Sequence, residues 1–507
     1  MDLKWIEKFN QIYNRPEENK IDKSKKNIIS PSLTESIAYF KASFNESDEL
    51  MIRKVNIVGV SSAIISWGGM ISKDLFANGV FNQICKAHID GSPLKKYEYL
   101  RDSIISSAEQ SEVSTYEDAF NFIMSGFVVI AMDGCDRMLA IAAQGFNTRG
   151  ISDPNSETMQ RDSREGFVES LATNMTMIRR RMKTTNLKYE KIKVGSVSNT
   201  DVCLCYLTNK VSSKILEEVK NKLNNANLET VMASGYLIPY LEEKNDWSLF
   251  NSVGMSERPD TICGKLNEGR IAVIIDGTPT VLVVPYLFIE YFQNLDDYSM
   301  RPYFATFTRW LKYISFFISI LFPALYVGIG TFNPEVFPNE LLSKIAMAVG
   351  KTPFSLTLET IIILFIYEVM REAGLRLPKP LGHAVSIVGG LVIGQAAVES
   401  GLIGAPTLMI VALTAISSYV VPNLYEAMAI LRLLLVLVGG FTGIWGIMLV
   451  FCAVIVNICS KSNFGIPFTA PIAPFNLFSM RDVLVRAGWK TLSKKDNKVQ
   501  NMPGSNI

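Results

Sequence analysis

The sequence has few of the residues from which most metal and redox sites are built. The 507-residue chain contains two histidines, His88 and His383, which argues against a histidine-rich metal site or proton relay. None of its seven cysteines has the spacing of a structural zinc site or a disulfide framework. Cys203 and Cys205 would share one face of a strand, so a pair is conceivable, but two small buried residues are the favoured interpretation. No metal and no cofactor is therefore predicted.

Strong charge of one sign and an apolar N-terminal segment are also missing. The formal net charge is +2 and no basic arm stands out, so the composition gives no indication of nucleic-acid binding. The first twenty residues contain no uninterrupted apolar run, so no signal peptide is predicted. The large N-terminal region is accordingly expected to stay in the cytoplasm.

Catalytic motifs are lacking as well. Gly350-Lys351-Thr352 resembles the end of a phosphate-binding loop, but that motif needs a glycine five residues before Gly350, where Ile345 stands. The sequence has no GxSxG, HExxH or kinase-like set. Asp133 and Asp276 each precede a glycine, which is typical of turns. We therefore predict that the chain is not an enzyme.

Long apolar runs dominate the second half of the chain. The mean hydropathy is +0.20, and the apolar residues are concentrated beyond residue 300. About twenty apolar residues are enough to cross a bilayer as a helix. We therefore predict an all-α polytopic transmembrane domain at 301–460. Its five or six helices are expected at about 311–330, 354–370, 384–401, 402–421 and 427–458.

Basic residues predict the orientation of these spans, because they mark the cytoplasmic side. They precede the first span, separate the second from the third, and recur in a cytoplasmic tail at 461–507. Two cytoplasmic ends require an even number of spans. Ala427–Ile458 is too long for one untilted span at about 1.5 Å per residue, and a break at Gly439, Gly440 or Gly443 would resolve this. Arg432 is interpreted as a cytoplasmic-side anchor.

The N-terminal half predicts a soluble α+β or α/β region of two subdomains. A flexible charged leader at 1–34 precedes the subdomains at 35–150 and 151–300. Two hairpins are expected, because strand-forming runs flank Asp133-Gly134 and Asp276-Gly277. Their strands are predicted at Phe127–Met132 with Arg137–Ala143, and at Arg270–Ile275 with Thr280–Pro285.

Further elements of the soluble region follow from periodicity. A strand is expected at Lys54–Ser66, entering a helix or loop at Trp67–Gly69, and 94–124 is mostly helical in period. The helix Gly166–Thr184 ends in the basic run Arg179–Arg181, which is interpreted as a solvated helix end rather than a phosphate site. The remaining predicted elements are the strands Lys191–Val197 and Val202–Leu207 and the helix Ser212–Asn224.

The third apolar segment, Leu381–Gly401, is the candidate functional helix, since at ~100° per residue its side chains divide between two faces. The candidate pore-lining face carries Val385, Val388, Val392, Gln395 and Glu399. The opposite, candidate packing face carries Ser386, Gly390, Gly394 and Ala397, and its GxxxG spacing allows close helix contact in lipid.

Two interpretations of the first face remain open. In one, the valines form a hydrophobic gate and Glu399 forms an acidic ring at an external mouth. In the other, Gln395 and Glu399 hydrogen-bond to neighbouring helices.

Several blocks of the sequence resemble the A subunit of bacterial spore germinant receptors, the GerA family of Bacillus and Clostridium. The resemblance runs from about residue 35 to about residue 490. It is carried by Arg164–Phe167, Glu257-Arg258-Pro259-Asp260, Glu268-Gly269-Arg270, Asp276-Gly277-Thr278-Pro279, Asp297-Tyr298 and Leu381–Gly401. In the blocks between Glu257 and Gly277 we favour a structural role over ligand binding, with Arg258 and Asp260 locking a loop to the hairpin.

The resemblance implies a function and a set of partners. Such receptors lie in the inner membrane of the spore and combine the A subunit with a transporter-like B subunit and a lipoprotein C subunit. The A subunit is expected to form a homo-oligomer that lies in membrane lipid. This oligomer would be a nutrient-gated channel through which monovalent cations pass. The alternative is a non-conducting scaffold or signalling subunit of the same receptor.

Overall fold

The computed structural model describes residues 28–44, 47, 49–72, 89, 91–104, 110–143, 145, 163–242, 248–377, 392–477, 479–492 and 498–506. The chain divides into two compact units. The first comprises Met1–Ser152, Phe167–Ile192 and Cys203–Asn209, and the second comprises Asp153–Gly166, Lys193–Val202 and Lys210–Ile507. The predicted leader lies almost wholly outside the described residues, and the predicted domain boundaries stay predictions.

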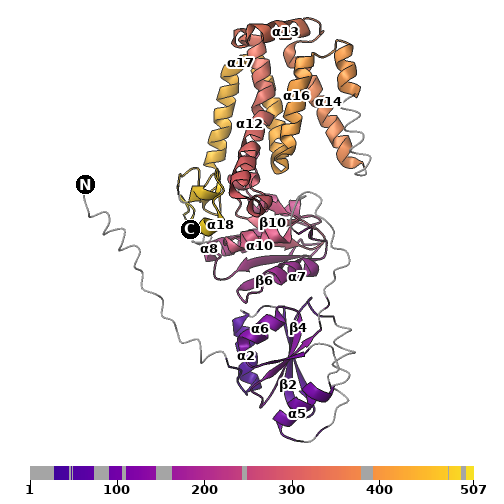
Figure 1. The fold of residues 1–507 in the computed structure, drawn as a ribbon, viewed down its shortest axis with the longest axis vertical. Helices are drawn as coiled ribbons and strands as arrows, with labels where there is room; N and C mark the ends of the chain where they lie inside the picture. The colour runs from indigo at the N-terminus through magenta and orange to yellow at the C-terminus, as the bar shows by residue number, and fades with distance from the viewer. Residues whose placement is uncertain are drawn as a thin grey trace, which may run out of the picture. The chain divides into compact units, whose positions relative to one another are not determined.

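The first unit contains a five-stranded antiparallel sheet in the order β1-β2-β4-β5-β3 (Figure 1). In register, Ile64 lies opposite Ile130, and Val128 lies opposite Ile141. The three central strands, β2, β4 and β5, are apolar and largely buried, whereas the edge strands β1 and β3 are mostly exposed. The strands are β1 Leu50–Ile57, β2 Val60–Trp67, β3 Gln110–Val113, β4 Phe127–Met132 and β5 Met138–Ala142. The helices are α2 Leu33–Ser43, α5 Pro93–Tyr99, η2 Leu100–Ile104, α6 Tyr116–Ile123 and α7 Leu171–Arg181.

The prediction of a single strand at Lys54–Ser66 is wrong. The expected single strand Lys54–Ser66 is the hairpin β1–β2, which turns at Val58 and Gly59 with φ of 51° and 75°. Valine rarely adopts a positive φ, so the sequence carried no ordinary turn signal there. The stretch 94–124, expected to be mostly helical, is helical over most of its described residues, with the short strand β3 between the helices.

The basic end of α7 was also interpreted wrongly at Arg179. Its side chain is fully buried and donates to the carbonyl oxygens of Thr184 and Leu187, each at 2.8 Å. The guanidinium lies 4.2 Å from the ring centroid of Trp67 and 5.1 Å from that of Tyr189. Arg179 is therefore a core residue, held by cation–π contacts and by hydrogen bonds to carbonyl groups.

The second sheet has the order β6-β7-β9-β10-β8. Its strands are β6 Leu187–Val194, β7 Thr200–Leu207, β8 Gly254–Ser256, β9 Ile271–Ile275 and β10 Val281–Val284. The associated helices are α8 Ser213–Asn224, η3 Ser234–Leu237, α9 Ile238–Leu241, α10 Pro259–Asn267, η4 Phe288–Phe292 and α11 Asp296–Ser299. Both predicted Asp-Gly hairpins are confirmed, since Gly134 and Gly277 have φ of 80° and 87° between paired strands. Cys203 and Cys205 are buried and free, as favoured.

The helical region follows in the second unit (Figure 1). It comprises α12 Pro302–Phe332, η5 Pro334–Val336, α13 Asn339–Val349, α14 Leu356–Arg376, α16 Ala405–Tyr419, η6 Pro422–Leu424 and α17 Tyr425–Ser460. Residues 392–399 are also helical. The first, second, fourth and fifth apolar segments are therefore helical as predicted, whereas α13 was not foreseen. The first part of the third segment lies outside the described residues.

The long helix α17 is broken at Gly443, whose φ of 66° and ψ of −153° are not helical. Gly443 lies beside Phe332, at the end of α12. The start of α17 adjoins residues 419–423, which share a cavity with β8. Past its end, Asn463 donates to the Ser252 carbonyl oxygen, again next to β8. The two halves of α17 therefore run in opposite directions, with their turn at Gly443.

The segment after α17 folds back onto the second sheet and its helices. It contains β11 Ser462–Asn463, β12 Ile466–Pro467, η7 Ser479–Asp482, α18 Trp489–Leu492 and η8 Val499–Asn501. Val499 is fully buried, and its backbone N–H donates to the carbonyl oxygen of Glu268 at 2.8 Å. The predicted tail at 461–507 is thus folded over most of its length.

Candidate functional site

The helical residues 392–399 present one exposed face and one packed face. Val392 is 56% exposed, and Gln395 and Glu399 are also exposed. Gly394 is buried, and a Cβ there would lie 3.3 Å from the Leu408 side chain of α16. A side chain at position 394 would crowd Leu408, so glycine favours the close approach of α16 to this helix. Val385, Ser386, Val388 and Gly390 lie outside the described residues.

The polar groups of this helix bond to each other. The Gln395 side-chain amide donates to Glu399 at 2.8 Å, between exposed side chains one turn apart. Ala397 is half-buried and packs against the apolar core of the helical region. The bond within the helix leaves both polar side chains on the exposed face.

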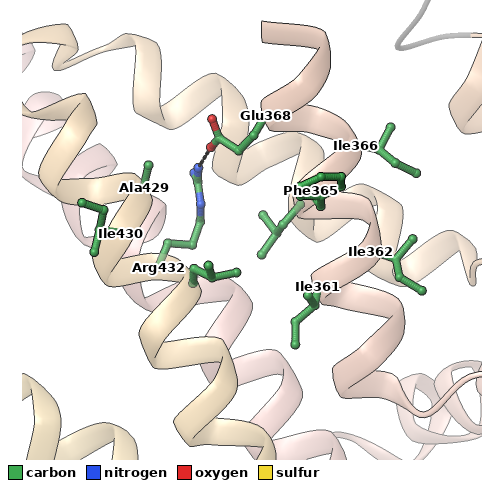
Figure 2. A pocket seen from close by; sticks show the side chains of 10 residues that line it. Ile361, Ile362, Phe365, Ile366, Glu368, Ala429, Ile430 and Arg432 are labelled. Atoms are coloured by element: carbon green, nitrogen blue, oxygen red, sulfur yellow. Dashed lines mark hydrogen bonds and ion pairs between the residues drawn. The ribbon is translucent and has the colours of Figure 1, made fainter. Parts of the chain in front are cut away.

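A buried ion pair joins α14 to α17 (Figure 2). Arg432 is 2% exposed, and its Nη2 lies 2.6 Å from Glu368 Oε1. The same guanidinium donates through Nη1 to Ser418 of α16 at 3.1 Å. Arg432, interpreted as a cytoplasmic-side anchor, is thus a buried residue paired within the helical bundle, and its side of the membrane stays a prediction.

Further hydrogen bonds extend this ion pair into a network over four helices. The Tyr425 hydroxyl donates to Glu368, 2.8 Å from each carboxylate oxygen, and Arg371 stacks on the Tyr425 ring at 4.0 Å. The hydroxyl of Ser418 is 2.8 Å from that of Ser319 on α12. Charged side chains within membrane helices are usually paired in this way and often functional.

An open cavity of about 670 Å³ lies between α14 and α17 beside this ion pair (Figure 2). Apart from Glu368 and Arg432, its lining is apolar. The apolar lining residues are Ile361, Ile362, Leu364, Phe365, Ile366, Ala429, Ile430 and Leu433.

Glu359, a second acidic residue of α14, is bonded to the start of α16. Glu359 is fully buried, and it accepts from the backbone N–H of Gly404 at 2.7 Å and from the Thr352 hydroxyl at 3.3 Å. Gly404 is the N-cap of α16, so the carboxylate accepts a hydrogen bond from a donor at the start of that helix. Its negative charge also interacts favourably with the positive end of the helix dipole.

A second buried charge cluster lies at the beginning of α12. Arg309 Nε is 3.2 Å from Asp297, its Nη1 is 3.0 Å from Asp482, and Lys312 Nζ is 3.1 Å from Asp297. Arg309 and Lys312 belong to the basic residues near the start of the first span, which were used above only to predict the cytoplasmic side. They instead tie α12 to α11 and to the segment after α17, a partner that no local sequence signal could identify.

The Glu257–Asp260 block forms a compact ion pair. Arg258 is buried and bonds Asp260 through Nε at 3.1 Å and Nη2 at 2.6 Å. The same Nη2 donates to the Ser163 carbonyl oxygen at 2.7 Å, so the preceding segment is tied to α10. Gly269 has a φ of 85°, and a Cβ there would lie 2.7 Å from the carbonyl oxygen of Lys210. The structural role favoured for this block stays a prediction.

Arg270, from the Glu268-Gly269-Arg270 block, reaches the buried carboxylate of Glu290. Glu290 is paired with both Arg270 and Lys265, and it also accepts from the backbone N–H of Leu287 at 2.8 Å. Burial acts to raise the pKa of the Glu290 carboxyl, but the two neighbouring cations outweigh it and lower the pKa below its ordinary value.

We expect this carboxylate to make the stability of the protein sensitive to acid. Because its pKa is lowered in the folded state, its contribution is complete above the unfolded value of about 4.3 and is lost as the pH falls through the folded pKa. Glu290→Gln should lower stability at pH 7 by about 3–5 kcal/mol, and the deficit should narrow as the pH falls below that unfolded value. The measurement is thermal unfolding as a function of pH. The exposed Glu217→Gln is the control, and a deficit independent of pH would contradict the assignment.

These features define a membrane protein that combines two antiparallel sheets with a helical bundle crossed by buried ion pairs. Two of the described helices, Pro302–Phe332 and Pro422–Ser460, are long and apolar enough to cross a membrane. Residues 38–498 match the model of the Bacillus/Clostridium GerA spore germination protein family. The chain belongs to this family, so its function lies in spore germination.

The relatives agree with this assignment along most of the chain. Spore germination protein KA of Bacillus subtilis is 36% identical, over 94% of this chain and 88% of that protein. The uncharacterized membrane protein YfkQ of B. subtilis is 33% identical, over 92% and 91% respectively. Spore germination protein GerLA of Bacillus cereus is 30% identical, over 92% and 96%.

Among solved structures, the chain is similar to the N-terminal domain of the A subunit of the Bacillus megaterium spore germinant receptor GerK3. The identity is 28% and the TM-score is 0.41, over 52% of this chain and 97% of that domain.

Proposed function

We propose that the chain is the A subunit of a spore germinant receptor and that several copies form a nutrient-gated cation channel. The observation that supports the channel proposal is that residues 392–399 have two faces. One face contains Gly394 and packs against α16, and the other contains Gln395 and Glu399 and is exposed. Lipid disfavours a carboxylate at such a position, whereas a water-filled path does not. The exposed face would line that path, with permeant monovalent cations attracted by Glu399.

The proposed topology places the soluble region and the tail in the cytoplasm. The reversal of α17 at Gly443 supports six crossings, because its two ends adjoin the same strand β8. The protein would lie in the inner membrane of the spore, with a transporter-like B subunit and a lipoprotein C subunit as partners. Nutrient binding by a partner would then bias the bundle between closed and open arrangements.

A change at Val392 tests the gate directly. Val392→Ala removes two carbons from a proposed apolar constriction, at about 0.8 kcal/mol for each CH₂, so ion release without nutrient should rise about tenfold. Val388→Ala is expected to act in the same direction. The readout is cation release from spores in the absence of nutrient, with the exposed neighbour Ile393→Ala as control. Spores of both variants that stay dormant and nutrient-responsive would argue against a gate here.

The alternative function is a non-conducting scaffold or signalling subunit of the same receptor. The ion pairs that join α12 to α11 and to the tail, and α14 to α17, favour it, since they suit a relay of conformational change. Glu399→Gln separates the two functions, because a channel should change its conductance or cation preference while a scaffold should not. Glu340→Gln, in α13, is the control.

A further inference from the structure

A cavity of about 250 Å³ lies between α10 and the corner that joins α16 to α17. Its volume corresponds to about eight water molecules at about 30 Å³ each, which suits a small polar group rather than a large ligand. One wall is formed by Arg258, Thr261 and Lys265 around α10, and the opposite wall by Tyr419 and Asn423. A group bound here would touch both the soluble part of this unit and the helical bundle.

The charged side chains that line the cavity are cationic. They are Arg258 and Lys265, and the described lining contains no aspartate or glutamate. Their carboxylate partners are Asp260 for Arg258, and Glu290 and Glu268 for Lys265, and none of these three belongs to the lining. The ion pairs hold both cationic side chains in position. An anion that enters the cavity would therefore contact these positive groups directly, whereas the carboxylates are not among the residues that line it.

Neutral donors complete the lining. The hydroxyl of Thr261 and the side-chain amides of Asn294 and Asn423 face no recorded hydrogen-bond partner among the described residues. Hydroxyl and amide groups can donate to the oxygens of an anion, and a phosphate offers several such oxygens around one centre.

We propose that this cavity binds a phosphate group that bridges α10 and the α16–α17 corner. The group would belong either to a small phosphorylated solute or to the headgroup of an anionic phospholipid. Binding stabilises whichever arrangement of the bundle keeps the two walls at this spacing, so occupancy regulates the conformational change in which the subunit takes part.

The test uses the full-length protein in nanodiscs of phosphatidylcholine, with inorganic phosphate as the probe. Phosphate should raise the thermal unfolding temperature more than chloride at equal ionic strength does. Lys265→Gln should weaken the apparent affinity about tenfold, because one charge-assisted hydrogen bond is lost. Asn423→Trp should abolish the effect by filling the cavity from an exposed position. Asn224→Trp, at the exposed end of α8, should retain it.

A second arm separates the two sources of phosphate. If phosphatidylglycerol in the nanodisc stabilises the protein, and if free phosphate then adds nothing, the ligand is a lipid headgroup. If free phosphate still acts, the ligand is a solute. The proposal is overturned if neither probe stabilises the protein, or if both stabilise the Asn423→Trp and Asn224→Trp variants equally. Binding is read without ion conductance, so failure here would leave the channel proposal standing.

Discussion

Glu368→Leu is expected to lower the free energy of unfolding by about 3–5 kcal/mol, because it leaves the Arg432 guanidinium buried without its carboxylate. The Ser418 hydroxyl, 3.1 Å from Arg432, cannot neutralise that charge. Replacing both partners, in Glu368→Leu with Arg432→Met, should restore most of the loss, since apolar side chains suit the adjoining cavity. Thermal unfolding in one fixed detergent measures the stability of the unchanged protein, of Glu368→Leu and of the double variant.

The matched control lies one turn further along α14. Glu372 is 49% exposed and pairs with the largely exposed Arg376, so Glu372→Leu should cost at most about 1 kcal/mol. A Glu368→Leu protein as stable as this control would mean that the buried ion pair contributes nothing to the fold. A double variant that is stable but no longer responds to nutrient would instead assign the network to signal transmission.

Gly443→Ala is the second change for which we expect a large effect. The backbone at Gly443 is in a region that is essentially restricted to glycine, so any side chain there should cost about 1–3 kcal/mol in strain. A Cβ would also lie 3.0 Å from the Phe332 ring, which adds crowding. The variant should therefore unfold at a lower temperature, or α17 should straighten and separate its two ends.

Labelling of Cys459 distinguishes these outcomes. This exposed thiol lies near the end of α17, so straightening would change its accessibility to a membrane-impermeant reagent from each side of the membrane. Gly264→Ala in α10 is the control, because a Cβ there meets nothing within 4 Å and alanine is the better helix former. Full stability and unchanged labelling of Gly443→Ala would show that the turn does not depend on glycine.

The elements that sequence predicted well are those specified by local chemistry. Asp133-Gly134 and Asp276-Gly277 supply a positive φ between strand-forming runs, so both hairpins could be placed. The same reasoning missed the turn at Val58, because its positive φ is imposed by pairing of the flanking strands and not by the residue type. A break near Gly443 could be predicted, because the stretch is too long for one untilted span and contains a cluster of glycines.

The charged residues were harder to place, since a sequence gives the sign of a charge but not its distant partner. Arg309 pairs with Asp482, 173 residues away, and Arg432 pairs with Glu368, 64 residues away. The rule for positive residues predicts a side of the membrane from the sign of a charge and identifies no partner for it. The division of this helix into two faces is a prediction from helical geometry alone, and in the structure Gly394 is buried while Gln395 is exposed.

The order in which the chain is synthesised gives the folded tail a further consequence. Val499 bonds to Glu268, and Asp482 bonds to Arg309, so the α10–α12 region gains contacts from residues made after every apolar helix. Ribosomes release the N-terminal part first, and domains generally fold in that order. Here the soluble part of the second unit cannot complete its packing until the helices have inserted and returned the tail to the same side. A chain that inserts wrongly would keep this surface exposed, and a protease or chaperone on that side of the membrane would recognise it.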